Sequence, residues 1–206
     1  MRTIPTTLPR RRPRQARAQA TVEAIIKATA IVLVEEGYDR ASTNRIAQAA
    51  GVSIGSLYQY YPSKEALVAA LVTHHMECME SALTHSLAQS SPVQLGDRAR
   101  LLVRGMTAAY RVNAQLHHVL CQEVPKVGEL RKIYDFEQRL AEVCRRHLFS
   151  GSDTIRPIDV DRAVFLLVNA VPSVIRAAIQ ADPLAQSDER LAEELTDMMV
   201  RYLAAA

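Results

Sequence analysis

The stretch STNRIAQAAGVSIGSLYQYY, residues 42–61, decides the fold that we expect for this chain. Ser42 is suited to cap a short helix, because its hydroxyl can accept a hydrogen bond from a free backbone N–H of the first turn. Gly51 is suited to the left-handed conformation of a tight turn, and Ser53 can cap a second short helix. A short helix, a glycine-containing turn and another short helix form the helix-turn-helix pattern.

The second of these helices is expected to show polar and small side chains to solvent. Val52 and Leu57 would face the shared core, which leaves exposed Ile54, Gly55, Ser56, Tyr58, Gln59 and Tyr60. In a major groove a glutamine can pair with adenine and an isoleucine can touch a thymine methyl group. The tyrosine hydroxyls, with Thr43 and Lys64, can hold phosphates. The alternative is an ordinary helical hairpin whose tyrosines are half-buried.

Helical periodicity extends on both sides of the motif. Apolar residues recur at helical spacing from Thr21, with Gly37 as the expected stop. A long helix should follow Ser63 to about Gln89, and further helical segments are expected at 95–112, 114–123, 126–149, 158–181 and 187–204. Prolines 92, 125, 157 and 183 fall at the breaks, whereas Pro172 lies inside an apolar run and should kink its helix. No alternating strand pattern occurs, so we expect an all-α fold.

Charge divides the chain unevenly. Up to Lys64 there are ten Lys and Arg residues against four Asp and Glu, and beyond it fifteen against eighteen. A basic N-terminal third followed by an acidic remainder favours an anionic partner for the N-terminal third alone. The alternative is that the basic residues form a solvated tail. We expect a flexible basic arm over 1–18, a DNA-binding head over 19–66 and a helical body over 67–206. The arm carries charge without acid, at Arg10, Arg11, Arg12, Arg14 and Arg17.

Several classes of protein are disfavoured. No run of about 18 uncharged apolar residues occurs and no apolar signal core follows the arginines, so we expect a cytoplasmic protein without a membrane partner. No GxSxG, phosphate-loop or HExxH motif is present, so we expect neither an enzyme nor a cofactor. Three cysteines each have a histidine at helical spacing, but no further ligands lie nearby, and we expect no metal. These pairs are His74 with Cys78, His117 with Cys121, and Cys144 with His147.

Residues 21–71 resemble the DNA-binding domain of the TetR family of bacterial repressors. The resemblance lies in EEGYD (Glu35–Asp39) and in STNRIAQAAGVSIGSLYQYYPSKEALVAAL (Ser42–Leu71), above all in its G-V-S, L-Y and K-E-A-L elements. It implies about nine helices and a homodimer. Ile54, Gln59 and Tyr60 fall where family members vary, so base preference does not transfer. The positions that match the family's DNA contacts are Thr43, Asn44, Ser53, Ile54, Gly55, Ser56, Tyr58, Gln59, Tyr60 and Lys64.

The resemblance also implies that a small molecule binds inside the body and changes the spacing of the two heads. Side chains that could line such a cavity, or simply fill the core, are Met106, Tyr110, His117, Tyr134, Phe165 and Asn169. The last two helices resemble the family's dimer bundle, with Leu166, Ala170, Val174, Leu191, Leu195, Met198 and Tyr202.

We therefore expect a ligand-responsive repressor that binds a palindromic double-stranded operator as a homodimer. A mostly apolar small molecule should release it. Two alternatives stay open. One is a TetR-like architectural or cell-division protein without an effector, and the other is a helical enzyme or carrier whose basic front is incidental.

Overall fold

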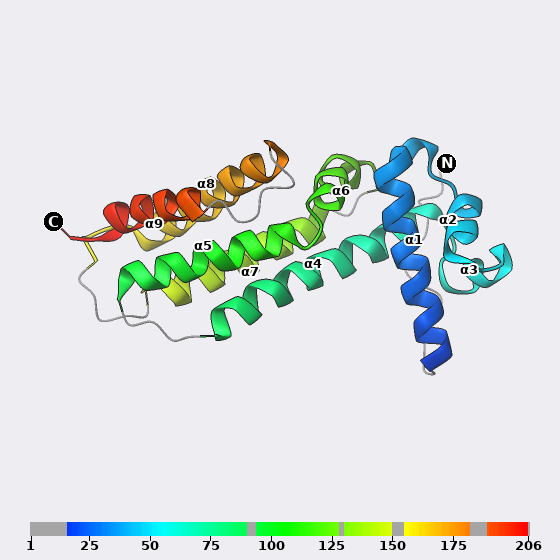
Figure 1. The fold of residues 1–206 in the computed structure, drawn as a ribbon, viewed down its shortest axis with the longest axis horizontal. Helices are drawn as coiled ribbons and strands as arrows, with labels where there is room; N and C mark the ends of the chain where they lie inside the picture. Colours follow the sequence, from blue (N-terminus) through cyan, green and yellow to red (C-terminus); the bar gives the residue numbers. More distant parts are fainter. Residues whose placement is uncertain (1–15, 90–93, 128–129, 150–154, 182–188, 206) are drawn as a thin grey trace. The chain divides into compact units, whose positions relative to one another are not determined.

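The structure, a computed structural model, describes residues 16–89, 94–127, 130–149, 155–181 and 189–205. This described part contains nine helices and no strand, so the chain is all-α as the sequence predicts (Figure 1). The helices are α1 (Ala16–Arg40), α2 (Thr43–Ala50), α3 (Ile54–Tyr60), α4 (Lys64–Ala88), α5 (Leu95–Arg111), α6 (Ala114–Val127), α7 (Leu130–Phe149), α8 (Val160–Ala181) and α9 (Glu189–Leu203).

The chain divides into two compact units. The first comprises Met1–His75 with Gln115–Lys132, and the second comprises Met76–Ala114 with Ile133–Ala206. The first unit thus holds α1, α2, α3, the first half of α4 and most of α6. The expected boundary between head and body at residues 66 and 67 stays a prediction.

The first helix is longer than its apolar pattern predicts. α1 begins at Ala16, five residues before Thr21. At Gly37 the backbone leaves helical geometry, with φ 74° and ψ 169°, so the predicted break is confirmed. A residue with a Cβ would be strained there. α1 packs against α2, and its fully buried side chains include Ile25 and Leu33.

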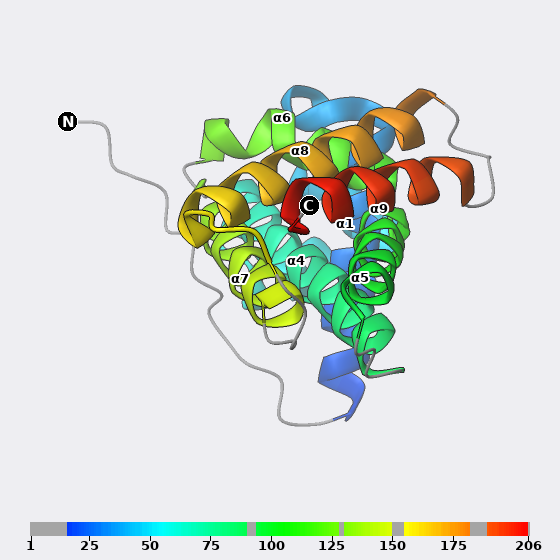
Figure 2. The same ribbon diagram turned by 90° about the vertical axis from the view of Figure 1, so that its left-hand side faces the viewer.

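The second unit is a helical bundle in which α5 packs against both α8 and α9. Figures 1 and 2 show α8 and α9 running side by side. The N–H of Arg156 donates to the carbonyl of Leu203 at 3.0 Å, which joins the segment before α8 to the end of α9. An ion pair between Arg104 and Glu189 links α5 to α9.

One proline behaves differently from expectation, and another lies inside a helix as expected. The segment predicted to end before Pro125 continues, because α6 runs through it to Val127 and α7 begins only at Leu130. A proline removes a single backbone donor, and packing can hold the helix through that loss. α8 contains Pro172, as predicted for a proline within an apolar run; Pro172 is buried in the second unit, and the expected kink stays a prediction.

Among the described residues one helix, α8, is long and apolar enough in composition to cross a membrane. This is weak evidence, since the core helix of a soluble protein meets the same criteria. Seven of its side chains are buried within the second unit, including Leu167, Val171 and Ile175. We infer that α8 is a helix of the bundle.

Candidate DNA-recognition site

Local sequence signals build the helix-turn-helix as predicted. The hydroxyl of Ser42 accepts the N–H of Arg45 at 3.3 Å and caps α2. Gly51 ends α2 in the left-handed region, with φ 66° and ψ 29°. Its N–H donates to the backbone carbonyls of Ala47 and Gln48. The hydroxyl of Ser53 accepts the N–H of Ser56 at 3.0 Å and caps α3. Each serine satisfies a backbone donor, and the N–H of Gly51 satisfies backbone carbonyls, that a free helix end would leave open.

A small apolar core holds the two helices against each other. Ile46 and Leu57 are 0% exposed, one from each helix. Ala47 is also buried, and its small side chain allows the helices to cross closely. Tyr61, which follows α3, is buried at 4% exposure, and burial raises the pKa of its phenol. This core fixes which face of α3 is left toward solvent.

Four of the six α3 residues that were predicted to be exposed are exposed. Ile54 is 38% exposed and Tyr58 41%, and Gly55 and Gln59 are exposed as well. Ser56 and Tyr60 are half-buried. On α2, Asn44 is exposed and Thr43 is half-buried. The predicted residues of the motif therefore lie on neighbouring turns of two short helices.

Two of the predicted phosphate-binding groups already contact each other. The hydroxyls of Thr43 on α2 and Tyr58 on α3 lie 3.0 Å apart. A hydroxyl can donate one hydrogen bond and accept another. This contact holds the Tyr58 ring in place and leaves its oxygen with capacity for a second partner, such as a phosphate.

Lys64 has a role within the unit that the sequence does not reveal. Its ammonium donates to the backbone carbonyl of Tyr38 at 2.8 Å and lies 4.1 Å from the centre of the Tyr38 ring. The hydroxyl of Tyr38 donates to Glu65 at 3.2 Å. These contacts fasten the end of α1 to the start of α4. A phosphate contact by Lys64 stays a prediction, and an ammonium has three donors to share.

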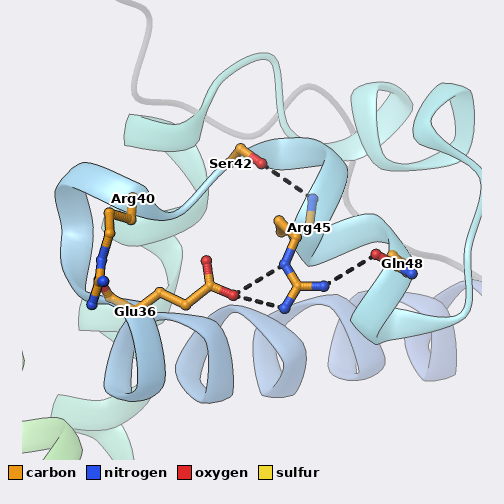
Figure 3. A network of polar contacts seen from close by, with 5 residues as sticks. All are labelled: Glu36, Arg40, Ser42, Arg45 and Gln48. Carbon is orange, nitrogen blue, oxygen red and sulfur yellow. Dashed lines mark hydrogen bonds and ion pairs between the residues drawn. The ribbon is translucent and has the colours of Figure 1, made fainter.

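A second network of hydrogen bonds and an ion pair, which sequence reasoning missed, joins α1 to α2 (Figure 3). The Nε and Nη2 of Arg45 donate to the same carboxylate oxygen of Glu36 at 3.0 and 2.7 Å. The Nη1 of Arg45 donates to Gln48 at 3.2 Å, and Arg40 donates to the backbone carbonyl of Glu36 at 2.9 Å. Arg45 is half exposed, so we expect a modest effect on stability. The network orients α2, which carries α3.

The charge of this region is one-sided. Between Asp39 and Glu65 the sequence contains no acidic residue, whereas Arg40, Arg45 and Lys64 lie within or beside that span. A polyanion such as DNA would meet no repelling side chain along the span, and cations near it favour phosphates.

The predicted arm falls largely outside the described residues. That is the case for Arg10, Arg11, Arg12 and Arg14. Arg17 lies in α1, but its side chain is not described. Their part in DNA binding stays a prediction.

The six residues predicted to line an effector cavity have different surroundings, and the cavity itself stays a prediction. Met106 and Tyr110 are buried in the second unit, whereas His117 is buried in the first. Tyr134 and Phe165 are 60% and 65% exposed, and Asn169 is also exposed. The Asn169 amide donates to the carbonyl of Phe165 at 2.7 Å, within α8.

The seven predicted dimer residues divide into two sets. On α8 they form an exposed row, with Leu166 50% and Val174 41% exposed and Ala170 exposed between them. On α9, Met198 is 42% exposed, but Leu195 is only 5% exposed and belongs to the core of its own subunit. Leu191 and Tyr202 are half-buried. Phe165, assigned to a cavity by its sequence, is exposed on the same helix, and we count it with these residues as the exposed row of α8.

The three cysteine–histidine pairs have different surroundings. Cys144 is fully buried, and burial raises the pKa of its thiol to about 12. Cys78 is half-buried. Cys121 is exposed, with its sulfur 3.5 Å from Nε2 of His117. Within the described parts of the chain, no three His, Cys, Asp or Glu residues are grouped to hold a metal ion.

The fold and the motif define a helix-turn-helix protein of the DNA-binding class, and comparison with known proteins agrees. The pattern described as bacterial regulatory proteins of the tetR family matches residues 25–71. The pattern described as the tetracyclin repressor-like C-terminal domain matches residues 94–203. These two matches account for most of the chain, so the protein belongs to the TetR family of bacterial transcriptional regulators.

Individual relatives are more distant. An uncharacterised helix-turn-helix transcriptional regulator of Mycobacterium tuberculosis is 26% identical over 183 residues, which are 87% of this chain and 92% of the relative. The nucleoid occlusion factor SlmA of Haemophilus ducreyi is 36% identical over 67 residues, a third of either protein. Among solved structures, the fatty acid degradation regulator FadR of Bacillus halodurans has a TM-score of 0.69 at 17% identity, covering 91% of this chain and 96% of that one. This last likeness shows the shared fold.

Proposed function

We propose that this regulator is a repressor whose homodimer binds a palindromic operator, with α3 of each subunit in the major groove. The observation that carries the proposal is the face of α3, on which Ile54, Tyr58 and Gln59 are exposed beside an acid-free, basic span. A twofold protein dimer matches a twofold DNA site. Such a protein works in the bacterial cytoplasm and on the nucleoid when it is bound to its operator.

The exposed row of α8 supports the dimer. Phe165, Leu166 and Val174 leave apolar surface in water along a helix, with Met198 on α9 exposed as well. Several large apolar side chains exposed on one helix are typical of an interaction site. A second copy covers it with an equal row, which is the self-complementary contact of a twofold dimer.

We further propose that a mostly apolar small molecule binds once per subunit and lowers operator affinity. The family membership of residues 94–203 supports an effector-binding body. Reciprocity requires that operator DNA weaken effector binding by the same factor. Isothermal titration with and without operator tests this relation; equal affinities in both titrations contradict it.

The DNA part is tested by selecting sequences from a random duplex pool and footprinting the product. We expect a twofold site. Tyr58→Phe should weaken binding to all sites alike, because it removes a phosphate-binding hydroxyl, and Gln59→Ala should change the selected bases. Gln138, exposed on α7, gives the control variant Gln138→Ala, which should bind like wild type. If both α3 variants select the wild-type site with wild-type affinity, α3 is not the recognition helix.

Mapping the bound sites across the genome separates a repressor from an architectural role. A few sites at promoters support the proposal. The likeness to SlmA covers only a third of this chain and therefore gives little support to a cell-division role. Many dispersed sites, without an effect on the expression of nearby genes, would favour that role instead.

A further inference from the structure

Three side chains form a chain of contacts between α4 and α6 inside the first unit. Nε2 of His75 lies 3.3 Å from Nδ1 of His117, and Nε2 of His117 lies 3.5 Å from Sγ of Cys121. The histidines are buried, at 3% and 7% exposure, whereas Cys121 is exposed. The chain therefore runs from the interior of the unit to a sulfur on an exposed residue.

One arrangement of protons satisfies all three groups. Burial, and to a lesser extent the charge of His74, lowers the pKa of His75 to about 4. His75 is thus neutral at neutral pH, and its Nε2 can accept the Nδ1–H of His117. Nε2 of His117 then accepts the S–H of Cys121. If the thiol proton moves to that nitrogen, the imidazolium donates to the thiolate and keeps its other hydrogen bond to His75.

A thiol, a base within reach and a third group that orients the base constitute an activated nucleophile. We propose that Cys121 is a nucleophilic thiol, activated by His117 and positioned through His75, that forms covalent adducts with α,β-unsaturated carbonyl compounds. The thiolate sulfur bonds to the β-carbon, the carbon–carbon double bond opens, and the α-carbon takes the proton held by Nε2 of His117. No group is oxidised or reduced, and no further reactant is needed.

The alternatives for this cluster fit the geometry less well. A single metal ion cannot use all three side chains as placed, because Nδ1 and Nε2 of one imidazole point in different directions and face different partners. A mere core packing role does not account for a cysteine on an exposed position. Cys144 shows the contrasting case of an inert thiol, fully buried and with its pKa raised to about 12.

An adduct has a route to the DNA-binding helices. Cys121 and His117 lie on α6, within the same compact unit as the helix-turn-helix. Alkylation removes the contact of Cys121 with His117 and so disturbs the link between α6 and α4. This step rests on the proposed function, and it predicts that the adduct changes operator affinity.

The reactivity is tested with N-ethylmaleimide, which is an α,β-unsaturated carbonyl compound, on the full chain carrying Cys78→Ser. Mass spectrometry of the intact protein and of its peptides should show one adduct, at Cys121, while Cys144 stays unmodified. His117→Asn keeps a donor toward His75 but removes the base. If that base raises the thiolate fraction about tenfold, alkylation near pH 7 should slow about threefold in the variant, since a less basic thiolate is also less nucleophilic.

Measurements near pH 9.5, above the ordinary thiol pKa, separate activation from access. There both thiols are ionised, so the rate advantage of wild type should disappear, and His117→Asn, with the more basic thiolate, should react up to about threefold faster than wild type. His75→Gln, which retains a side-chain hydrogen-bonding group, should react at an intermediate rate near pH 7. Equal rates near pH 7 overturn the proposal, and so does a variant that is slower by the same factor at both pH values, because the histidine would then control access alone.

Operator binding is measured separately on the unmodified and alkylated protein. A change in affinity on alkylation that is absent in Cys121→Ser supports the link to the head. An unchanged affinity overturns that link and leaves the alkylation result standing. If the unmodified protein selects no DNA, the proposed function fails, and the mass measurement still decides whether Cys121 is nucleophilic.

Discussion

Truncating Phe165 should dissociate the dimer without unfolding the subunit. The side chain is 65% exposed on α8, in the row that we assign to the partner contact. A phenylalanine offers roughly 200 Å² of side-chain surface, so about 130 Å² is available for a second copy to cover. Phe165→Ala removes about 100 Å² of it.

At about 25 cal/mol per Å² this loss is worth about 2.5 kcal/mol per subunit. Twofold symmetry places two such side chains in the interface, so the dimer loses about 5 kcal/mol if both are covered completely. Since each 1.4 kcal/mol is a factor of ten, the dissociation constant should rise by about three and a half orders of magnitude. The unfolding free energy of the isolated subunit should hardly change, because the side chain is largely exposed within it.

Sedimentation equilibrium from nanomolar to micromolar concentration measures the dissociation constant, and urea unfolding monitors the fold. Tyr134→Ala is the matched control, since this aromatic side chain on α7 is 60% exposed but lies outside the row. Leu195→Ala is the opposite control, because Leu195 is 5% exposed and its loss should destabilise the subunit by about 2–5 kcal/mol. The assignment would be refuted if Phe165→Ala had the dissociation constant of wild type, or if its dissociation constant rose less than that of Tyr134→Ala.

Deleting residues 1–17 should reduce the slope of log affinity against log salt by about 0.9 for each arginine that meets a phosphate, as fluorescence anisotropy can measure; an unchanged slope means that the arm makes no such contact. Leu57→Ala, which empties a fully buried site in the helix-turn-helix core, should cost about 2–5 kcal/mol of unfolding free energy, and a loss below about 1 kcal/mol in urea would contradict that packing. The pKa of His75 is lowered to about 4 in the folded protein, so the unfolded chain takes up the proton first as pH falls. Stability should therefore be level above about pH 6.5 and decline by up to about 3 kcal/mol toward pH 4, and His75→Gln should remove this decline; parallel curves for the two proteins would exclude His75 as its source.

Signals confined to a few neighbouring residues could be predicted from the sequence. Ser42 and Ser53 cap their helices, and Gly51 and Gly37 take positive φ where a turn and a break were expected. Each of these outcomes depends on the residue and its nearest backbone. The exposed face of α3 follows from the same local pattern, because Leu57 fixes the buried side.

Contacts between distant residues could not be predicted in this way. Glu36 and Arg45 are nine residues apart and on different helices, and Lys64 reaches Tyr38 across 26 residues. No periodicity encodes such pairs, because they exist only once the helices have been placed. They nevertheless orient α2 and the start of α4, which together carry α3.

An apolar stripe also does not say what it packs against. Leu195 and Met198 belong to the same helix and both looked like interface residues, yet Leu195 is buried in its own subunit and Met198 is 42% exposed. Phe165 gives the converse case, since an aromatic residue in an apolar run suggested an interior position. Hydrophobicity favours the burial of a side chain. The arrangement of neighbouring helices decides whether that side chain is buried within its own subunit or against a partner.

The division of the chain into units gives α6 a particular place in regulation. Gln115–Lys132 belongs to the same compact unit as the helix-turn-helix, although about forty residues of α4 and α5 lie between them in the sequence. The contact between His75 and His117 is one physical link within that unit. A ligand or adduct acting on α6 therefore acts on the unit that reads DNA, and needs no separate transmission through α5, α8 or α9. Substitutions at His117 should accordingly alter operator affinity even in the absence of any effector, whereas substitutions on the exposed row of α8 should act only through dimerisation.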